Sequence, residues 1–294
     1  MSKVFGNEKR LVIADRTCGE ERAFYGTCDT VFSNCIIDGA EDGESAVKEC
    51  RRIDLEDCRF ALRYPIWHVD GCKVTNCRFE DTCRAPLWYC DRISIYGSEI
   101  LGVKAVRECG KVEMVDCDVV SAEFGWKTRG FTALNTDITA EYLFLDSSDI
   151  YLENVTVKGK YTFQYVKNAV IKNCVLDTKD AFWHAENVTV YDSVVKGEYL
   201  GWYSKNLKLV RCKIEGTQPL CYARGLVLED CTMTACDLSF ERSEVDATVI
   251  GSIDSVKNPE RGRITASNVG DVISEDGREK KTVLCLGEGS EQVI

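Results

Sequence analysis

A short pattern decides the fold: the chain reads AVIKNCVL (169–176), VTVYDSVV (188–195), LKLVRCKI (207–214) and LVLEDCTM (226–233). Corresponding residues in these segments are 19 positions apart. We number each segment from its small residue, so that position zero is Cys174, Ser193, Cys212 or Cys231. Apolar residues then stand at positions −5, −3 and +2. This spacing of two indicates β-strands, because a helical repeat would be longer and would show a period of 3.6.

The pattern extends well beyond these segments. Position zero falls at Cys35, Cys58, Cys77, Ser98, Cys117, Thr136, Val155, Cys174, Ser193, Cys212 and Cys231. The residue before it is Asn or Asp in nine of eleven copies, the exceptions being Gly97 and Arg211. Because Asn, Asp and Gly tolerate a left-handed backbone, one turn can recur in every coil. We predict an all-β fold, a single-stranded right-handed parallel β-helix of about 11–13 coils of 19 residues. Its phase is expected to continue through Ile250 and Val269.

Charge and composition limit the function classes. The chain has 37 Lys and Arg against 48 Asp and Glu, a net charge of −11. Phosphate binding along a nucleic acid needs a basic surface, so a nucleic-acid partner is not expected. The longest apolar run, from Ala85 to Cys90, is far shorter than the roughly 20 residues of a membrane span. Polar residues from Asn7 to Arg10 interrupt any secretory signal, so we expect a cytoplasmic protein without a membrane partner.

The 17 cysteines have a structural explanation in this repeat. Seven of them occupy position zero, where the other residues are Ser, Thr and Val, so the position takes a small inward side chain. A buried free Cys behaves as a small hydrophobe, and in a reducing compartment we expect stacked thiols rather than disulfides. The absence of any CxxC pair argues against a metal or redox site, and we expect no metal and no cofactor.

Positions +6 to +10 are predicted to form a third strand. All five tryptophans fall at +9, and both histidines at +10, beside Tyr89, Tyr165, Tyr203 and Tyr222. Strand alternation would place +7 and +9 on one face and +8 on the other. Either +8 faces the core and an aromatic stripe lies outside, which we favour, or the tryptophans line an enlarged interior. An outer aromatic row suits stacking on sugar rings or contact with a partner protein.

The stripe contains the candidate site residues. The expected ligand-binding residues are Asp146, Tyr165, Trp183, His184, Tyr199, Trp202, Tyr203, Gln218 and Tyr222. His184 is the one weak candidate for a catalytic residue, as a general base among tyrosines. The alternative for His184 is a surface histidine hydrogen-bonded in a side-chain stack. Phe240 and Glu241 are expected at +9 and +10 of the following coil.

The sequence gives little support for an enzymatic activity. Glycoside hydrolysis needs two carboxylates that converge across the bond, and the nearest pair, Asp237 and Glu241, shares one strand. A calcium-dependent lyase needs several oxygen ligands together, which the pattern does not supply. Whether the protein is an enzyme is left open.

Three stretches carry a family resemblance: DAFWHAENVTVYDSVVKGEYLGWYSKNLKL (180–209), GTQPLCYARGL (216–226) and SIDSVKNPERGRI (252–264). They resemble a bacterial family of unknown function in the pectin-lyase-like β-helix superfamily, whose members are sometimes labelled hydrogenase. The resemblance implies a right-handed parallel β-helix and brings no established activity or catalytic residues. The paired cysteine ligands of a hydrogenase are absent from this sequence.

The sequence thus predicts residues 1–28 as an N-terminal strand and cap, 29–275 as coils, and 276–294 as a C-terminal strand or tail. Two functions stay open. The first is a protein that binds or modifies carbohydrate through the aromatic stripe, with an oligosaccharide as partner. The second is a non-enzymatic scaffold that forms homo-oligomers through the same stripe.

Overall fold

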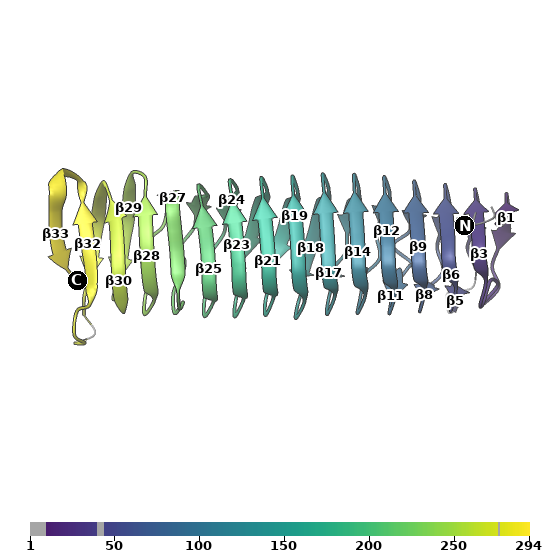
Figure 1. Cartoon of the computed structure of the whole chain (residues 1–294), viewed down its shortest axis with the longest axis horizontal. Helices are drawn as coiled ribbons and strands as arrows, with labels where there is room; N and C mark the ends of the chain where they lie inside the picture. Colours follow the sequence, from purple (N-terminus) through teal and green to yellow (C-terminus); the bar gives the residue numbers. More distant parts are fainter. Residues whose placement is uncertain (1–9, 40–43, 276) are drawn as a thin grey trace, which may run out of the picture.

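A computed structural model describes residues 10–39, 44–275 and 277–294, and it is an all-β parallel solenoid. The chain makes about 14 turns of about 19 residues each, which confirms the predicted fold class. Strands of successive coils lie side by side along a straight rod, with β1 at one end and β33 at the other (Figure 1). The predicted N-terminal cap falls partly on residues 1–9, which lie outside the described residues.

The first face of the rod carries the long strands, which pair in parallel from β1 to β32. Its strands are β1 (Leu11–Ala14), β3 (Cys28–Ser33), β6 (Arg51–Glu56), β9 (Asp70–Thr75), β12 (Asp91–Tyr96), β14 (Gly110–Val115), β17 (Arg129–Leu134), β19 (Ser148–Glu153), β21 (Lys167–Lys172), β23 (Glu186–Tyr191), β25 (Lys205–Val210), β27 (Leu226–Thr234), β28 (Glu244–Val249), β30 (Arg261–Ala266) and β32 (Thr282–Leu286). A short 3₁₀ turn (Gly287–Gly289) leads into β33 (Ser290–Val293), which pairs antiparallel to β32 at the C-terminal end.

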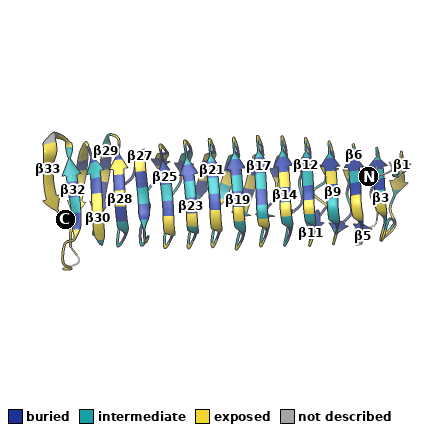
Figure 2. Cartoon of the chain, viewed as in Figure 1, coloured by how far each residue is buried: buried dark blue, intermediate teal, exposed yellow. Residues whose placement is uncertain are grey.

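Shorter strands form the second face. They are β2 (Thr17–Cys18), β4 (Ile36–Ile37), β7 (Arg59–Phe60), β10 (Arg78–Phe79), β13 (Glu99–Ile100), β15 (Asp118–Val120), β18 (Asp137–Leu143), β20 (Thr156–Lys160), β22 (Val175–Lys179), β24 (Val194–Lys196), β26 (Lys213–Glu215), β29 (Ser252–Lys257) and β31 (Asn268–Ile273). Among the described residues, the strands of the third side are β5 (Glu44–Lys48), β8 (Tyr64–Trp67), β11 (Leu87–Trp88) and β16 (Glu123–Phe124). Burial alternates along the strands and leaves a continuous apolar interior (Figure 2).

A left-handed residue makes the corner between the first two faces. Every residue at position −1, from Asn34 to Asp230, has a φ between 49° and 55°. Gly97 and Arg211, the two exceptions to the Asn/Asp pattern, share this conformation with φ values of 55° and 51°. One turn conformation therefore recurs in all eleven coils, as the composition of this position predicts.

Position zero, directly after that corner, joins successive coils by a hydrogen bond at six steps of the rod, whereas the apolar side chain of Val155 cannot accept one. The Cys58 N–H donates to Sγ of Cys77 at 3.4 Å, and the Cys174 N–H donates to Oγ of Ser193 at 2.9 Å. The accepting group in turn donates to the carbonyl two residues earlier, as Ser193 does to Tyr191 O at 2.6 Å. Cys, Ser and Thr recur here because each can accept and donate at once. The prediction of a small inward residue at position zero is confirmed. The hydrogen bonds restrict the residue type at this position further than side-chain size does.

All 17 cysteines are free thiols, as expected. Burial raises the pKa of the Cys174 thiol to about 11, and burial raises the pKa of Cys83 and of Cys236 to about 12. These thiols therefore keep their protons at neutral pH and act as donors to carbonyl groups.

The predicted alternation on the third side is wrong. Positions +7 and +8 are both buried, as in Ala181 and Phe182, whereas Trp183 is half-buried and His184 is exposed. The cause is a left-handed residue at +8 itself, where Phe182 has a φ of 63°. It breaks the period of two and turns two successive side chains inward. The favoured alternative, with +8 in the core and the tryptophans outside, agrees with this burial.

The predicted phase also shifts by one residue after Cys231. Val249, rather than Ile250, pairs with Cys231, and Ile250 is 58% exposed. Phe240 is fully buried with a φ of 67°, as residues at position +8 are. Phe240 therefore occupies position +8 of its coil, and Glu241 occupies position +9. The Tyr222 N–H accordingly donates to Glu241 O at 2.6 Å. The register of β27 with β28 shifts between Leu228 and Cys231, which accounts for the position of Ile250.

We expect Ser193→Ala to destabilise the protein by about 1–3 kcal/mol, because the buried N–H of Cys174 loses its acceptor. Ser193→Cys keeps an acceptor of the type found in neighbouring coils, and its loss of stability should be smaller. Urea unfolding measures both. Equal losses for the two variants would contradict the proposed hydrogen-bond role of position zero.

Candidate functional site

The aromatic stripe follows a second corner of the coil. We define it as two columns, the inner one at +9 and the outer one at +10, from Trp67 and His68 to Cys221 and Tyr222. Each outer residue donates its N–H to the inner residue of the next coil: His184 N to Trp202 O at 3.0 Å, and Tyr165 N to Trp183 O at 2.9 Å. This ladder holds neighbouring side chains of a column one coil apart.

In the outer column the rings stack face to face along the rod. His184 lies between Tyr165 and Tyr203, with centroid distances of 5.0 Å on each side and interplanar angles of 7° and 9°. Tyr222 continues the stack beyond Tyr203 at 4.9 Å and 14°. Tyr165 and Tyr203 are still 50% and 43% exposed. His184 and Tyr203 each have an aromatic ring on both faces, so these two residues present their ring edges to solvent.

The inner column is tied down by hydrogen bonds. The rings of Trp183 and Trp202 stack at 5.6 Å with an interplanar angle of 1°. Their indole N–H groups donate to backbone carbonyls of the next coil, Trp183 to Tyr199 O at 3.0 Å and Trp202 to Gln218 O at 2.8 Å. The Tyr199 ring meets Trp202 edge-on at 5.2 Å. These indoles are fixed by both polar and apolar contacts, so the surface is rigid.

The structure thus brings together seven of the predicted residues: Tyr165, Trp183, His184, Tyr199, Trp202, Tyr203 and Tyr222. Gln218 takes part through its backbone carbonyl. Asp146 is the exposed outer residue of the coil before Tyr165, and its N–H donates to Gln164 O at 3.0 Å. His184 has no hydrogen bond to a carboxylate among the described residues. Its ring stacks between the rings of Tyr165 and Tyr203, so His184 lies in a side-chain stack, and its role as a general base stays a prediction.

A second aromatic cluster on the same columns was not among the predicted site residues. Trp67 stacks on Trp88 at 5.3 Å, and His68 packs on Tyr89 at 5.0 Å. The guanidinium of Arg107 continues the inner column between Trp88 and Trp126, at 5.7 Å and 5.0 Å from the ring centroids. The recurrence of aromatic residues at +9 and +10 carried this signal in the sequence.

The left-handed backbone of the outer column indicates that bulky side chains are kept there in spite of their conformational cost. Outer residues are left-handed: φ is 53° at His184, 58° at Tyr165 and at Tyr203, and 59° at Tyr222. A bulky residue in this region costs about 1–2 kcal/mol, and Asn or Gly would relieve that cost, as at position −1. Strained backbone of this kind persists where the surroundings impose it, often at functional sites.

Asp180 is a polar residue of this region that the sequence analysis missed. It precedes Phe182 and Trp183 in the same coil and is only 5% exposed. Its carboxylate forms no hydrogen bond or ion pair with a described residue, because Lys179 pairs with Glu198 at 2.8 Å instead. Burial raises the pKa of Asp180, and the nearby Lys179 opposes that shift.

Among the residues that the structure describes, no group of three or more His, Cys, Asp or Glu side chains could hold a metal ion. Within the same described ranges, no helix is long and apolar enough to cross a membrane.

Comparison with known proteins identifies the family. The model of the family described as "Protein of unknown function (DUF3737)" matches residues 11–285, so the chain belongs to this family. No curated protein sequence matches the chain significantly. The pectin-lyase-like assignment stays a prediction.

Solved structures show distant likenesses only. HetL, a pentapeptide repeat protein involved in heterocyst differentiation regulation from the cyanobacterium Nostoc, is 11% identical with a TM-score of 0.30, over 75% of this chain and 92% of that one. The A-module of the Azotobacter vinelandii mannuronan C-5 epimerase AlgE4 is 8% identical with a TM-score of 0.34, over 94% and 88%. QnrB1, a plasmid-mediated fluoroquinolone resistance protein, is 11% identical with a TM-score of 0.20, over 81% and 90%.

Asp180→Asn should raise the melting temperature at neutral pH, because it removes a buried charge that has no hydrogen-bond donor. The raised pKa makes the folded state favour the protonated acid. Wild-type stability should therefore fall as pH rises through the folded pKa of Asp180, whereas the variant should lack this fall. Thermal melts from acid to neutral pH measure the difference. Asp177→Asn, at an exposed residue of β22, is the matched control and should change little. A destabilised Asp180→Asn at neutral pH would refute this account.

Proposed function

We propose that this member of the DUF3737 family is a non-catalytic scaffold, and that its aromatic stripe is the interface of an antiparallel homodimer. The observation that carries the proposal is the stacking of the outer column, which presents a straight row of ring edges, hydroxyls and imidazoles. Tyr and Trp are enriched at protein interfaces because they combine a large apolar body with a polar tip.

Ring geometry favours a protein partner over an oligosaccharide. Sugar binding by stacking uses an exposed aromatic face. Here His184 and Tyr203 are each covered on both faces by neighbours 4.9–5.0 Å away, and Trp183 and Trp202 cover one another. Such a surface offers edges to a partner, and edge-to-face contact with other aromatic rings is a favourable arrangement.

The order of residues along the outer column suggests that the partner is a second copy. The column runs His68, Tyr89, Glu108, Lys127, Asp146, Tyr165, His184, Tyr203, Tyr222. A two-fold axis between Lys127 and Asp146 would place each of these opposite the other in the second rod. The same axis would set Glu108 against Tyr165, Tyr89 against His184, and His68 against Tyr203. A shift by one coil would instead face Lys127 or Asp146 with its own copy, so charge disfavours that shift.

The stripe is long enough for such an interface. Eight coil steps separate His68 from Tyr222, which is roughly 40 Å at about 4.8 Å a step. A stable interface buries about 800 Å² per partner, and a strip about 20 Å wide would supply that area.

A charge-swap series tests the register. Lys127→Asp and Asp146→Lys should each convert a dimer to a monomer, because like charges would face one another across the axis. The double variant Lys127→Asp/Asp146→Lys should restore the dimer. Light scattering coupled to size exclusion, over a dilution series, measures the mass. Lys196→Glu, at an exposed residue of β24 outside the stripe, should leave the mass unchanged.

Three results would overturn the proposal: a wild-type monomer at every concentration, single variants that stay dimeric, or a double variant that stays monomeric. Titration of the wild type with oligosaccharides, followed by tryptophan emission, covers the competing ligand class. A saturable blue shift that Trp202→Ala abolishes would assign the stripe to sugars instead.

A further inference from the structure

Cysteines occupy position zero of consecutive coils in two runs. The N-terminal run is Cys35, Cys58 and Cys77, and the C-terminal run is Cys212 and Cys231. All of them are free thiols and at most 2% exposed. Cys117 and Cys174 also stand at position zero, but neither has a cysteine at this position in an adjoining coil. The rod thus holds two stacks of neighbouring thiols and two isolated thiols in equivalent places.

Equivalent hydrogen bonds give the sulfurs of neighbouring coils the same orientation. Cys58 Sγ donates to Glu56 O at 3.2 Å, and Cys77 Sγ donates to Thr75 O at 3.4 Å, in each case to the carbonyl two residues earlier. Each sulfur also lies within hydrogen-bond distance of a carbonyl oxygen of the preceding coil, at 3.6 Å and 3.4 Å. Because the two side chains make the same contacts, their sulfurs are displaced by one coil step of about 4.8 Å.

This spacing fits a metal ion with two ligands. A metal–thiolate bond is about 2.3 Å long in zinc sites, so a linear sulfur–metal–sulfur unit spans about 4.6 Å. Thiolates select soft cations such as Cu(I), which readily takes linear coordination by two sulfurs. Such a site needs neither a CxxC pair nor three converging ligands, because its two sulfurs come from neighbouring coils.

Backbone N–H groups already point at both sulfurs of the N-terminal run. The Cys35 N–H donates to Cys58 Sγ, and the Cys58 N–H donates to Cys77 Sγ, each at 3.4 Å. Such hydrogen bonds stabilise a thiolate, because they strengthen when the acceptor carries a charge. Asp57 and Arg59, on either side of Cys58, are both exposed. The thiol therefore lies directly beneath the surface of the corner.

We propose that neighbouring position-zero thiols bind Cu(I) as a linear bis-thiolate. Two thiols and one Cu⁺ give an anion with two S–Cu bonds and release two protons, so atoms and charge balance. Cys58 is the central ligand of the N-terminal site, with Cys77 or Cys35 as the second ligand, and Cys212 with Cys231 forms the other site. The neighbouring Cys77 thiol and burial raise the pKa of Cys58. Protons therefore compete with the cation, and binding should strengthen as pH rises.

Titration of the full chain with Cu(I), without oxygen and against excess bathocuproine disulfonate, tests the sites. The chelator removes Cu(I) from single thiols. Cys58→Ser leaves Cys35 and Cys77 two coils apart, so it should retain about one equivalent fewer than the wild type. Serine occupies position zero naturally at Ser193, so the variant keeps the hydrogen bonds of the coil. Cys117→Ser, which removes an isolated thiol, is the matched control and should retain the wild-type amount.

Cys212→Ser tests the second site independently and should also lose about one equivalent. Circular dichroism will show whether each variant folds, and copper K-edge spectra of the loaded wild type should show two sulfur ligands per ion. Three results would refute the proposal: no Cu(I) held against the chelator, wild-type retention by Cys58→Ser and Cys212→Ser, or an equal loss in Cys117→Ser. Spectra with three or more ligands per ion would also contradict the linear geometry.

Discussion

The structure depends on one constraint, the backbone N–H that follows each left-handed corner residue. The turn points this buried N–H at the next coil, where it needs an acceptor. A thiol or hydroxyl at position zero of that coil supplies one at six steps, as Cys77 does for Cys58 and Ser193 does for Cys174, whereas Val155 has no such group. The same group donates a hydrogen bond to a carbonyl oxygen, so the hydrogen bonds at position zero hold neighbouring coils in register. The abundance of free cysteine follows from this arrangement, since a protonated buried thiol is small, apolar and able to play both roles.

Rigid register is what makes the aromatic stripe possible. Because every coil repeats the same corners, residues at one position form a straight column, and aromatic rings in that column stack about 5 Å apart. Strain at the left-handed outer residues is tolerated because the strands on either side impose the backbone. Stacking has a further consequence, since it hides ring faces and exposes ring edges. In the sequence, this row of aromatic residues suggests a surface on which sugar rings could stack. With its ring faces covered, the row is better suited to contact with a protein.

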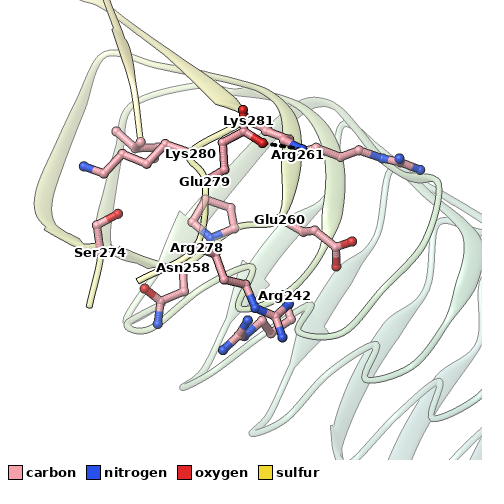
Figure 3. A pocket seen from close by; sticks show the side chains of 11 residues that line it. Arg242, Asn258, Glu260, Arg261, Ser274, Arg278, Glu279, Lys280 and Lys281 are labelled. Atoms are coloured by element: carbon pink, nitrogen blue, oxygen red, sulfur yellow. Dashed lines mark ion pairs between the residues drawn. The ribbon is translucent and has the colours of Figure 1, made fainter. Parts of the chain in front are cut away.

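Departures from the repeat mark the places where the rod carries other chemistry. Asp180 puts a carboxylate where burial is nearly complete and no donor approaches it. At the C-terminal end the turn between β29 and β30 and the segment before β32 line a cavity of about 250 Å³ that includes Asn258 (Figure 3). Neither feature is needed to build a coil. Both stand apart from the regular hydrogen-bond ladder of the central coils.

The sequence by itself determined the parallel solenoid, the coil length and the left-handed corner before position zero. Each depends on local chemistry that recurs at a fixed spacing: apolar alternation for the strands, and Asn, Asp or Gly where φ is positive. Tertiary structure decided what local patterns do not encode. The left-handed Phe182 and its equivalents overrode strand alternation. Local departures from the 19-residue repeat put Phe240 in the core, and the register shift between β27 and β28 put Ile250 outside it. The direction in which the rings stack, the isolation of Asp180 and the cavity around Asn258 arise between coils, from contacts whose distance and angle only the stacked rod fixes.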